Sequence, residues 1–215
     1  MADQQYAIEL ENITKSFGSV IANKNINLNV RQGEILALLG ENGSGKTTLM
    51  NMLSGIYKPD AGTIRVNGVP VSIHSPEDAK KYGIGMVHQH FKLVDVFSAA
   101  DNIWMGAEKT GCILRKSRYQ KISEISAKFE FDFQPEKRVS HMSVSEKQTL
   151  EILRVLYYGA KIIILDEPTA GLDPAGRDEI LRFARNLRDV HGITVVLVSH
   201  SMEDIARMAD RVIVM

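Results

Sequence analysis

The chain has 215 residues, 44% of them hydrophobic, which suits one large α/β domain with its own core. Its 26 basic and 26 acidic residues balance, so the net charge gives no support to a nucleic-acid-binding or anionic-membrane-binding protein. The single cysteine, Cys112, excludes an intramolecular disulfide, and the polar residues 1–11 do not form a signal peptide. The longest apolar runs, such as residues 193–198, are too short to span a bilayer. We therefore expect a partner to hold the chain wherever it acts at a membrane.

Short β-rich runs alternate with helical stretches, which predicts a layered α/β fold. Residues 6–13 and 25–30 alternate apolar and polar side chains, as half-buried strands do, and the apolar residues 34–39 enter a glycine-rich loop. The next expected elements are a helix after this loop, a strand over 63–67 ended by the turn Asn67-Gly68, a helix from Ser75 to Gly83 and a strand over 84–88.

Residues 91–139 are less strand-like and predict a mostly helical insertion. The later elements are a helix over 143–158, a strand over 162–165, a helix over 174–190, a strand over 193–198, a helix over 202–209 and a strand over 212–215. Their apolar strands lack alternation, which is typical of parallel strands covered on both faces. We predict one domain over 1–215 with a mostly parallel core sheet flanked by helices, an antiparallel β subdomain and a helical subdomain. The core and β subdomain would take 1–90 and 140–215, and the helical subdomain about 91–158.

The loop after residue 39 reads G-E-N-G-S-G-K-T between a strand and a helix, the full pattern of a P-loop. Glycines let the backbone wrap a phosphate, and the helix N-terminus favours anionic oxygens. Lys46 is predicted to reach the β- and γ-phosphates of ATP, and Thr47 to ligate Mg²⁺. The predicted nucleotide-binding residues of the loop are Gly40, Glu41, Asn42, Gly43, Ser44, Gly45, Lys46, Thr47 and Thr48.

Two acids end the strand at residues 162–165, where a P-loop protein needs them. Asp166 is placed to hold Mg²⁺, through water, and Glu167 to polarise the attacking water. The alternative is that both acids simply end a strand at the surface, which their pairing with the phosphate loop disfavours.

The phosphate loop and the acids Asp166 and Glu167 are part of an ordered set of motifs. The other members lie at Phe17, Gln89, Ser143, Asp173 and His200. Together these motifs resemble the nucleotide-binding domain of ABC transporters over essentially the whole chain. The resemblance implies that Phe17 stacks on adenine and that Gln89 senses Mg²⁺ and links to the membrane subunit. It also implies a signature serine, Ser143, a D-loop aspartate, Asp173, and a switch histidine, His200, which contacts the γ-phosphate. The implied catalytic residues are Lys46, Gln89, Glu167 and His200, and the implied metal-binding residues are Thr47, Gln89 and Asp166.

The resemblance also implies partners. Two nucleotide-binding domains would form a head-to-tail dimer in which each signature covers the ATP of the other copy. Transmembrane permease subunits would bind this dimer at the cytoplasmic face of the membrane, and a solute-binding protein would act indirectly. No nucleic acid is expected as a partner.

The signature itself departs from the family. It reads M-S-V-S-E rather than the usual L-S-G-G-Q, so Val144 and Ser145 replace two glycines. The spacing from Ser143 to Glu146 predicts a helix capping box. Because Glu146 adds negative charge near the predicted γ-phosphate position, we expect slow hydrolysis by the isolated chain.

Parts of the chain resemble different subfamilies. Residues 83–91 with 101–103, and residues 143–148 followed by 151–153, look like the ATPases of bacterial nucleoside and simple-sugar importers. That group usually carries two ATPase domains in one chain, and this chain would be the first. Residues 170–180 and 195–204 look more like energy-coupling-factor ATPases for vitamins or metal ions. We therefore hypothesise a natural or engineered hybrid joined near 166–169. The stop on a strand also makes a truncated chain an open alternative.

Two other functions remain open: a soluble ABC-type ATPase acting on ribosomes or DNA, and a fold module that binds ATP without a physiological partner. The apolar residues 91–97 suit docking of a membrane subunit's coupling helix, with an ordinary subdomain core as the alternative. His88 and His90 flank Gln89, but no third ligand stands at convincing spacing, so a metal site there is disfavoured.

Overall fold

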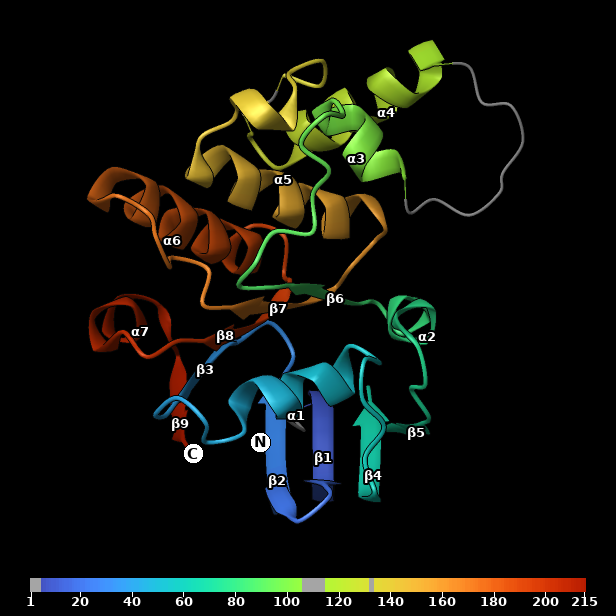
Figure 1. The fold of residues 1–215 in the computed structure, drawn as a ribbon, viewed down its shortest axis with the longest axis vertical. Coiled ribbons are helices and arrows are strands. Elements are labelled where there is room, and N and C mark those ends of the chain that lie inside the picture. The colour runs from blue at the N-terminus through green and yellow to red at the C-terminus, as the bar shows by residue number, and fades with distance from the viewer. Residues whose placement is uncertain (1–4, 106–114, 132–133) are drawn as a thin grey trace.

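A computed structural model of the chain describes residues 5–105, 115–131 and 134–215, with backbone alone over 115–118; Cys112 lies outside these ranges. The described chain forms two sheets with helices between and above them (Figure 1). One sheet has four antiparallel strands in the order β2-β1-β4-β5, and the other has five parallel strands in the order β6-β7-β8-β3-β9. The predicted fold class is confirmed.

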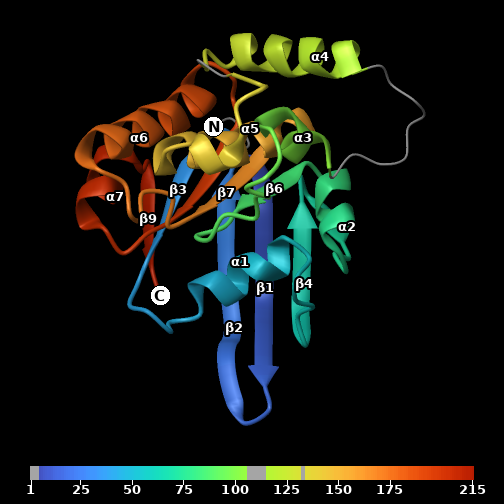
Figure 2. The same ribbon diagram turned by 45° about the horizontal axis from the view of Figure 1, so that its top comes forward.

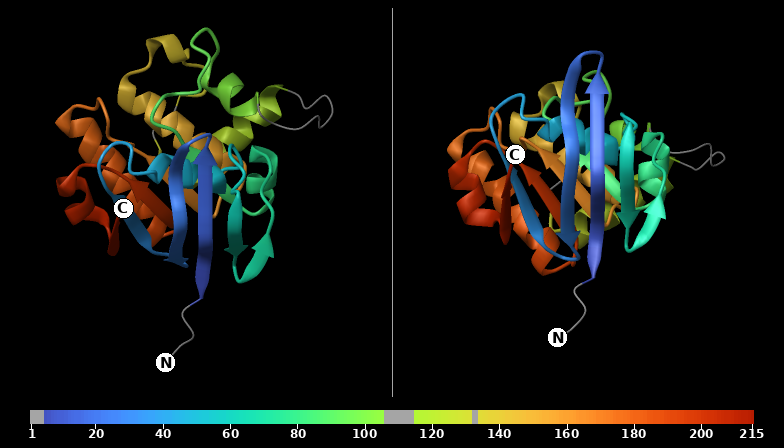
Figure 3. Two further views of the ribbon diagram at one scale, coloured as in Figure 1. Left: turned by 60° about the horizontal axis from the view of Figure 1, so that its bottom comes forward. Right: turned by 90° about the horizontal axis from the view of Figure 1, so that it is seen from below.

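The antiparallel sheet forms the face opposite the outer helices (Figure 3). Its strands are β1 (Tyr6–Phe17), β2 (Val20–Arg31), β4 (Ala61–Val66) and β5 (Val69–Val71). The β1–β2 hairpin is longer than predicted, because register shifts along it break the alternation of apolar and polar residues. The predicted turn at Asn67 and Gly68 joins β4 to β5, with both residues at positive φ. Strand β5 itself was not predicted; its Pro70 is tolerated because β5 lies at the sheet edge.

The parallel sheet is covered on both faces. It consists of β3 (Ile35–Leu39), β6 (Ile84–Val87), β7 (Ile162–Asp166), β8 (Thr194–Val198) and β9 (Arg211–Val214). Ile162 and Ile164 of β7 pack into a core shared with the antiparallel sheet, whereas Ile163 and Leu165 pack into a second core under the outer helices. Successive residues of a strand point to opposite faces, so a strand buried on both sides has no polar alternation. This confirms the predicted parallel strands.

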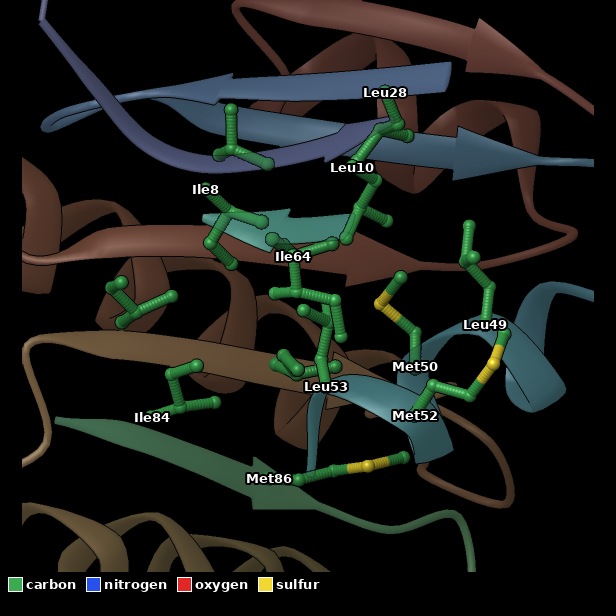
Figure 4. Close-up of a cluster of buried hydrophobic side chains, with 14 of the residues drawn as sticks. Ile8, Leu10, Leu28, Leu49, Met50, Met52, Leu53, Ile64, Ile84 and Met86 are labelled. Carbon is green, nitrogen blue, oxygen red and sulfur yellow. The ribbon is translucent and has the colours of Figure 1, made fainter. Parts of the chain in front are cut away.

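Helix α1 (Lys46–Leu53) lies between the two sheets (Figure 4). Its side chains Leu49, Met50, Met52 and Leu53 are fully buried. They share one core with Ile8, Leu10, Leu28 and Ile64 of the antiparallel sheet and with Ile84 and Met86 of β6. The glycine-rich loop at the start of α1 is therefore anchored by both sheets.

The remaining helices surround the parallel sheet: those after residue 143 cover its other face, the helix over 76–81 packs on the same side as α1, and the others belong to the insertion (Figure 2). They are α2 (Pro76–Lys81), α3 (Ala99–Trp104), α4 (Arg115–Lys128), a 3-10 helix (Val139–His141), α5 (Val144–Tyr157), α6 (Pro174–Asp189) and α7 (Met202–Met208). Within the described ranges, no helix is long and apolar enough to cross a membrane.

Helix α5 belongs to two cores at once. Ile152 and Leu156 pack under the parallel sheet, whereas Leu150 and Leu153 pack against α3 and α4. The range predicted for the core, 140–215, and the range predicted for the helical subdomain, about 91–158, both include this helix. Because α5 has two buried faces, it packs with both groups of elements.

Candidate active site

The phosphate loop has a backbone that requires glycine. Gly43 and Gly45 take φ values of 87° and 92°, and a Cβ on Gly45 would lie 2.5 Å from the carbonyl oxygen of Ala22 on β2. L side chains avoid this conformation, and no real Cβ approaches an oxygen so closely. Gly45 is also the N-cap of α1, and it offers no side chain to the first N–H groups of the helix. These donors can therefore serve an anion.

Lys46 places a buried ammonium at the centre of this loop. Its Nζ donates to the carbonyl oxygens of Gly40 at 2.7 Å and Glu41 at 2.8 Å, and lies 3.4 Å from Ser44 Oγ. The charge stands inside a concave loop of backbone groups, where it would add to the attraction of a phosphate.

Asp166 ends β7 and reaches the start of α1. Its Oδ1 accepts a hydrogen bond from Thr47 Oγ1 at 3.5 Å, and the residue is almost fully buried. Burial raises the pKa of the Asp166 carboxyl, while the hydrogen bond from Thr47 lowers it. A carboxylate and a hydroxyl so close together are oxygen donors of the kind that Mg²⁺ prefers, so these residues fit that ion.

Glu167 and His200 come from neighbouring parallel strands and meet at this edge. Glu167 takes a positive φ of 48°, which is unusual for a residue with a side chain, and its N–H donates to the Val198 carbonyl of β8 at 2.9 Å. Its Oε1 lies 2.8 Å from His200 Nδ1. The His200 side chain is 65% exposed, so one face of the pair opens to solvent. Strained backbone of this kind concentrates at functional sites.

Gln89 and Phe17 are exposed at the rim. Gln89 follows β6, the strand beside β7, so it lies at the same carboxyl edge of the sheet as Asp166. Phe17 ends β1, with the Tyr57 ring edge-on at 5.1 Å and Lys15 Nζ at 5.4 Å from its centroid. Tyr57 was not predicted for the site, because nothing in its sequence context marks it.

His88, beside Gln89, contacts a cation. Lys92 Nζ lies 3.0 Å from His88 Nε2. Burial, followed by the charges of Lys92 and Arg154, lowers the pKa of the His88 imidazole to about 4. These positive neighbours would repel a metal ion.

Ser143 and Asp173 lie away from the loop, at the starts of α5 and α6 on the other side of the parallel sheet (Figure 1). Ser143 forms the predicted capping box with Glu146, and Asp173 accepts from Gly176 N at 3.1 Å. A Cβ on Gly176 would lie 3.1 Å from Ser145 Cβ, so these two helix starts adjoin each other.

Two further features were not predicted from the sequence. Glu146 forms an ion pair with Lys137 at 2.5 Å, and this bond is the main reason that the pKa of the Glu146 carboxyl is lowered. Asp204, four residues after His200, is a buried acid that joins several loops. The pair of Glu146 with Lys137 joins residues nine apart in the chain, and the contacts of Asp204 join residues 27 and 35 apart.

Known proteins have similar sequences and the same fold. Residues 23–170 match the family model described as ABC transporter. The guanosine import ATP-binding protein NupO of Bacillus subtilis is 51% identical over 185 residues, which is 85% of this chain and 36% of that protein. The nucleoside import ATP-binding protein NupA of Lactococcus lactis is 44% identical over 209 residues, 96% of this chain and 41% of that protein. The chain thus spans about two fifths of the length of these relatives.

Solved structures agree with this assignment. The structure of cbiO1 from Clostridium perfringens, described as part of the ABC transporter complex cbiONQ, is similar with a TM-score of 0.84 and 29% identity over 99% of this chain and 85% of that one. The ADP conformation of MJ1267, an ATP-binding cassette of an ABC transporter, has a TM-score of 0.86 and 25% identity over 98% of this chain and 87% of that one. The chain therefore belongs to the ABC transporter family, as an ATP-binding domain.

Proposed function

We propose that the chain is the energy-coupling ATPase domain of an importer, and that it hydrolyses ATP at the loop of residues 40–48. The observation that carries this proposal is the contact of Glu167 with His200, beside Asp166 and Thr47. A carboxylate and an imidazole in contact at the edge of a phosphate loop can orient and deprotonate a water molecule. The proposed nucleotide is ATP, with Mg²⁺ as its metal.

Each group then has one task. The loop N–H groups and Lys46 would bind the β- and γ-phosphates, and Thr47, Asp166 and Gln89 would hold Mg²⁺. When bound, Mg²⁺ supplies positive charge that neutralises the phosphate oxygens. Glu167 accepts the proton of the attacking water. His200 holds Glu167 and reaches toward the γ-phosphate.

The second half of the site would come from another nucleotide-binding domain. Ser143 stands at an exposed helix start, and Val144 next to it is an exposed apolar residue. Helix N-termini bind anions, so this surface suits the γ-phosphate of a second copy in a head-to-tail dimer. Asp173, on the adjoining helix start, would face the same interface. Phe17 would stack on the adenine of the ATP that is bound to the phosphate loop of its own chain.

The proposed solute is a nucleoside or a simple sugar. The names of the two relatives refer to the import of guanosine and of nucleosides, and another relative is named for the import of galactose and methyl galactoside. Transmembrane permease subunits would bind the chain at the cytoplasmic face of the membrane, with a solute-binding protein acting through them. Val96 and Phe97, which are 71% and 41% exposed, offer an apolar surface for the permease.

Two variants test the ATPase proposal. Lys46→Ala removes the ammonium from the loop, and we expect loss of ATP binding and turnover. Glu167→Gln keeps the loop intact, so we expect retained binding, loss of turnover, and an ATP-dependent dimer seen by gel filtration with light scattering. Full binding and turnover by Lys46→Ala would contradict the proposal. A Glu167→Gln chain that stays monomeric in ATP would favour a fold module without a partner.

Partner capture separates the remaining alternatives. Retention by permease subunits, and not by ribosomes or DNA, is expected for an importer ATPase; the reverse would indicate a soluble ABC-type ATPase.

An energy-coupling-factor transporter for vitamins or metal ions is the second candidate, because residues 170–180 and 195–204 resemble that group. The hybrid hypothesis rests on the same residues. One natural full-length protein colinear with both parts would exclude an engineered hybrid.

A further inference from the structure

Asp204 is a buried acid outside the predicted site. It lies on α7 and is only 1% exposed. Its Oδ2 accepts from Thr169 Oγ1 at 2.7 Å, and its Oδ1 accepts from Arg177 Nε at 2.5 Å. A buried carboxylate without such donors would be strongly disfavoured, and here each oxygen of Asp204 has a donor.

The partners of Asp204 stand beside the predicted catalytic residues. Thr169 comes two residues after Glu167, in the turn that leaves β7. Arg177 lies on the first turns of α6, four residues after Asp173. Asp204 thus joins the turns that carry Glu167 and Asp173, although Thr169 and Asp204 are 35 residues apart in the chain.

The same network reaches His200. Ser201, the N-cap of α7, follows His200 directly, and its Oγ accepts from Asp204 N at 3.3 Å and from Arg177 NH2 at 2.7 Å. Because the His200 ring is mostly exposed, its position depends on this backbone. Helices α6 and α7 lie side by side at this end of the sheet (Figures 1 and 2).

We propose that Asp204 is a positioning residue for ATP hydrolysis, which sets Glu167, His200 and the start of α6 relative to one another. This inference rests on the proposed roles of Glu167 and His200. Asp204 does not touch the nucleotide. It acts through Thr169 and Arg177, because a small shift of either turn would change the 2.8 Å contact between the predicted base and the histidine.

Neighbouring Glu203 provides a matched control. It lies on the same helix and also pairs with Arg177, at 3.2 Å, but its side chain is 66% exposed. An exposed ion pair contributes little, so Glu203→Gln removes a charge from Arg177 without disturbing the buried network. Comparing the two acids therefore separates charge near Arg177 from positioning of the turns.

The experiment measures kcat, the Kd for a fluorescent ATP analogue and the melting temperature of the full chain. We expect Asp204→Asn to lower kcat by about tenfold or more with Kd changed less than about twofold, and Glu203→Gln to change neither. Thr169→Val should lower kcat as Asp204→Asn does, and Thr169→Ser, which keeps the hydroxyl, should restore it. These effects on kcat at constant Kd are not expected from lost stability alone.

Opposite outcomes would overturn the inference. A folded Asp204→Asn chain with unchanged kcat, or a kcat loss matched by Glu203→Gln, would remove the positioning role. If Asp204→Asn does not fold, the two Thr169 variants decide: equal kcat values for Thr169→Val and Thr169→Ser would also rule out the positioning role. Glu167→Gln in the parent chain separates this result from the proposed function: if it keeps full turnover, the role of Glu167 fails first.

Discussion

At the residue scale, the contacts of Glu146 bear on the effect that its charge is expected to have on the bound phosphate. The sequence suggested that its negative charge weakens the site for the γ-phosphate. In the fold, both carboxylate oxygens are engaged, since one accepts from Ser143 N at 2.8 Å and the other pairs with Lys137. The ammonium of Lys137 lies against this charge, so we expect the departure from the usual signature to cost less than the sequence alone implies.

Charge removal at this pair tests that conclusion. In the Glu167→Gln background, we expect Lys137→Met to weaken ATP-dependent dimerisation by about fivefold, because an exposed ion pair is worth about 1 kcal/mol at most. Adding Glu146→Gln should restore dimerisation, since glutamine keeps the capping box. Light scattering against ATP concentration gives the measurement. If the double variant is no better than Lys137→Met, the pair does not control the charge of the signature.

Residue-scale contacts of this kind could not be predicted from the sequence. The loop of residues 40–48 was predictable because its function depends on residues that are adjacent in the chain. Tyr57 and Asp204 make their contacts with residues far away in the chain, and the pair of Lys137 with Glu146 lies outside any motif that would mark it. Asp204 stands out as a candidate only because its carboxylate is buried, and its burial cannot be recognised from the sequence.

At element scale, Arg211 on β9 joins the two sheets. Its guanidinium pairs with Glu34 at 2.7 Å and donates to the Asn29 side chain on β2 at 3.0 Å. Glu34 is almost fully buried and also accepts from Arg31 N at 2.6 Å. Removing one partner of a buried ion pair leaves an uncompensated charge, which is more costly than losing an exposed pair.

We therefore expect Arg211→Ala to lower the free energy of unfolding by about 2–3 kcal/mol, because Glu34 keeps only part of its hydrogen bonding. The matched control is Arg207→Ala, whose pair with Asp178 is exposed on both sides and should cost less than about 1 kcal/mol. Urea denaturation with a common m-value measures both. Equal losses for the two variants would show that the Glu34 pair does not support the junction of the sheets.

The elements that the sequence predicted well share strong local signals. Helix α5 begins with a capping box, α2 has Ser75 as its N-cap and Pro76 as its first residue, and β7 is apolar up to its last residue, Asp166. The outer part of the β1–β2 hairpin and strand β5 were missed, because bulges break the alternation and Pro70 argues against a strand. Tertiary pairing overrides local propensity in both cases.

At the scale of the whole molecule, the site is a product of topology. The parallel order β6-β7-β8-β3 brings the ends of four strands to one edge. Asp166 ends β7, and Gln89, His200 and the phosphate loop follow the other three strands, so the sequence and the family resemblance together predict these residues for the site. The orientation of the helical subdomain depends instead on α5 and its two buried faces, which no motif specifies.

The same arrangement leaves Val96 and Phe97 exposed just before α3, in the helical subdomain. Burying this apolar surface against a permease would stabilise the complex without involving the phosphate loop. We expect the double variant Val96→Ser, Phe97→Ser to keep ATP affinity and basal turnover, and to lose about tenfold in copurification with coexpressed permease subunits.

Val69 offers the control for that experiment, because it is an equally apolar and 61% exposed residue on β5, in the other sheet. Val69→Ser should leave permease binding unchanged. If both variants retain the permease equally, the surface before α3 is not the docking site. If both lose it, general hydrophobic exposure rather than a specific interface holds the complex, and the link from this helical subdomain to the membrane subunits fails with it.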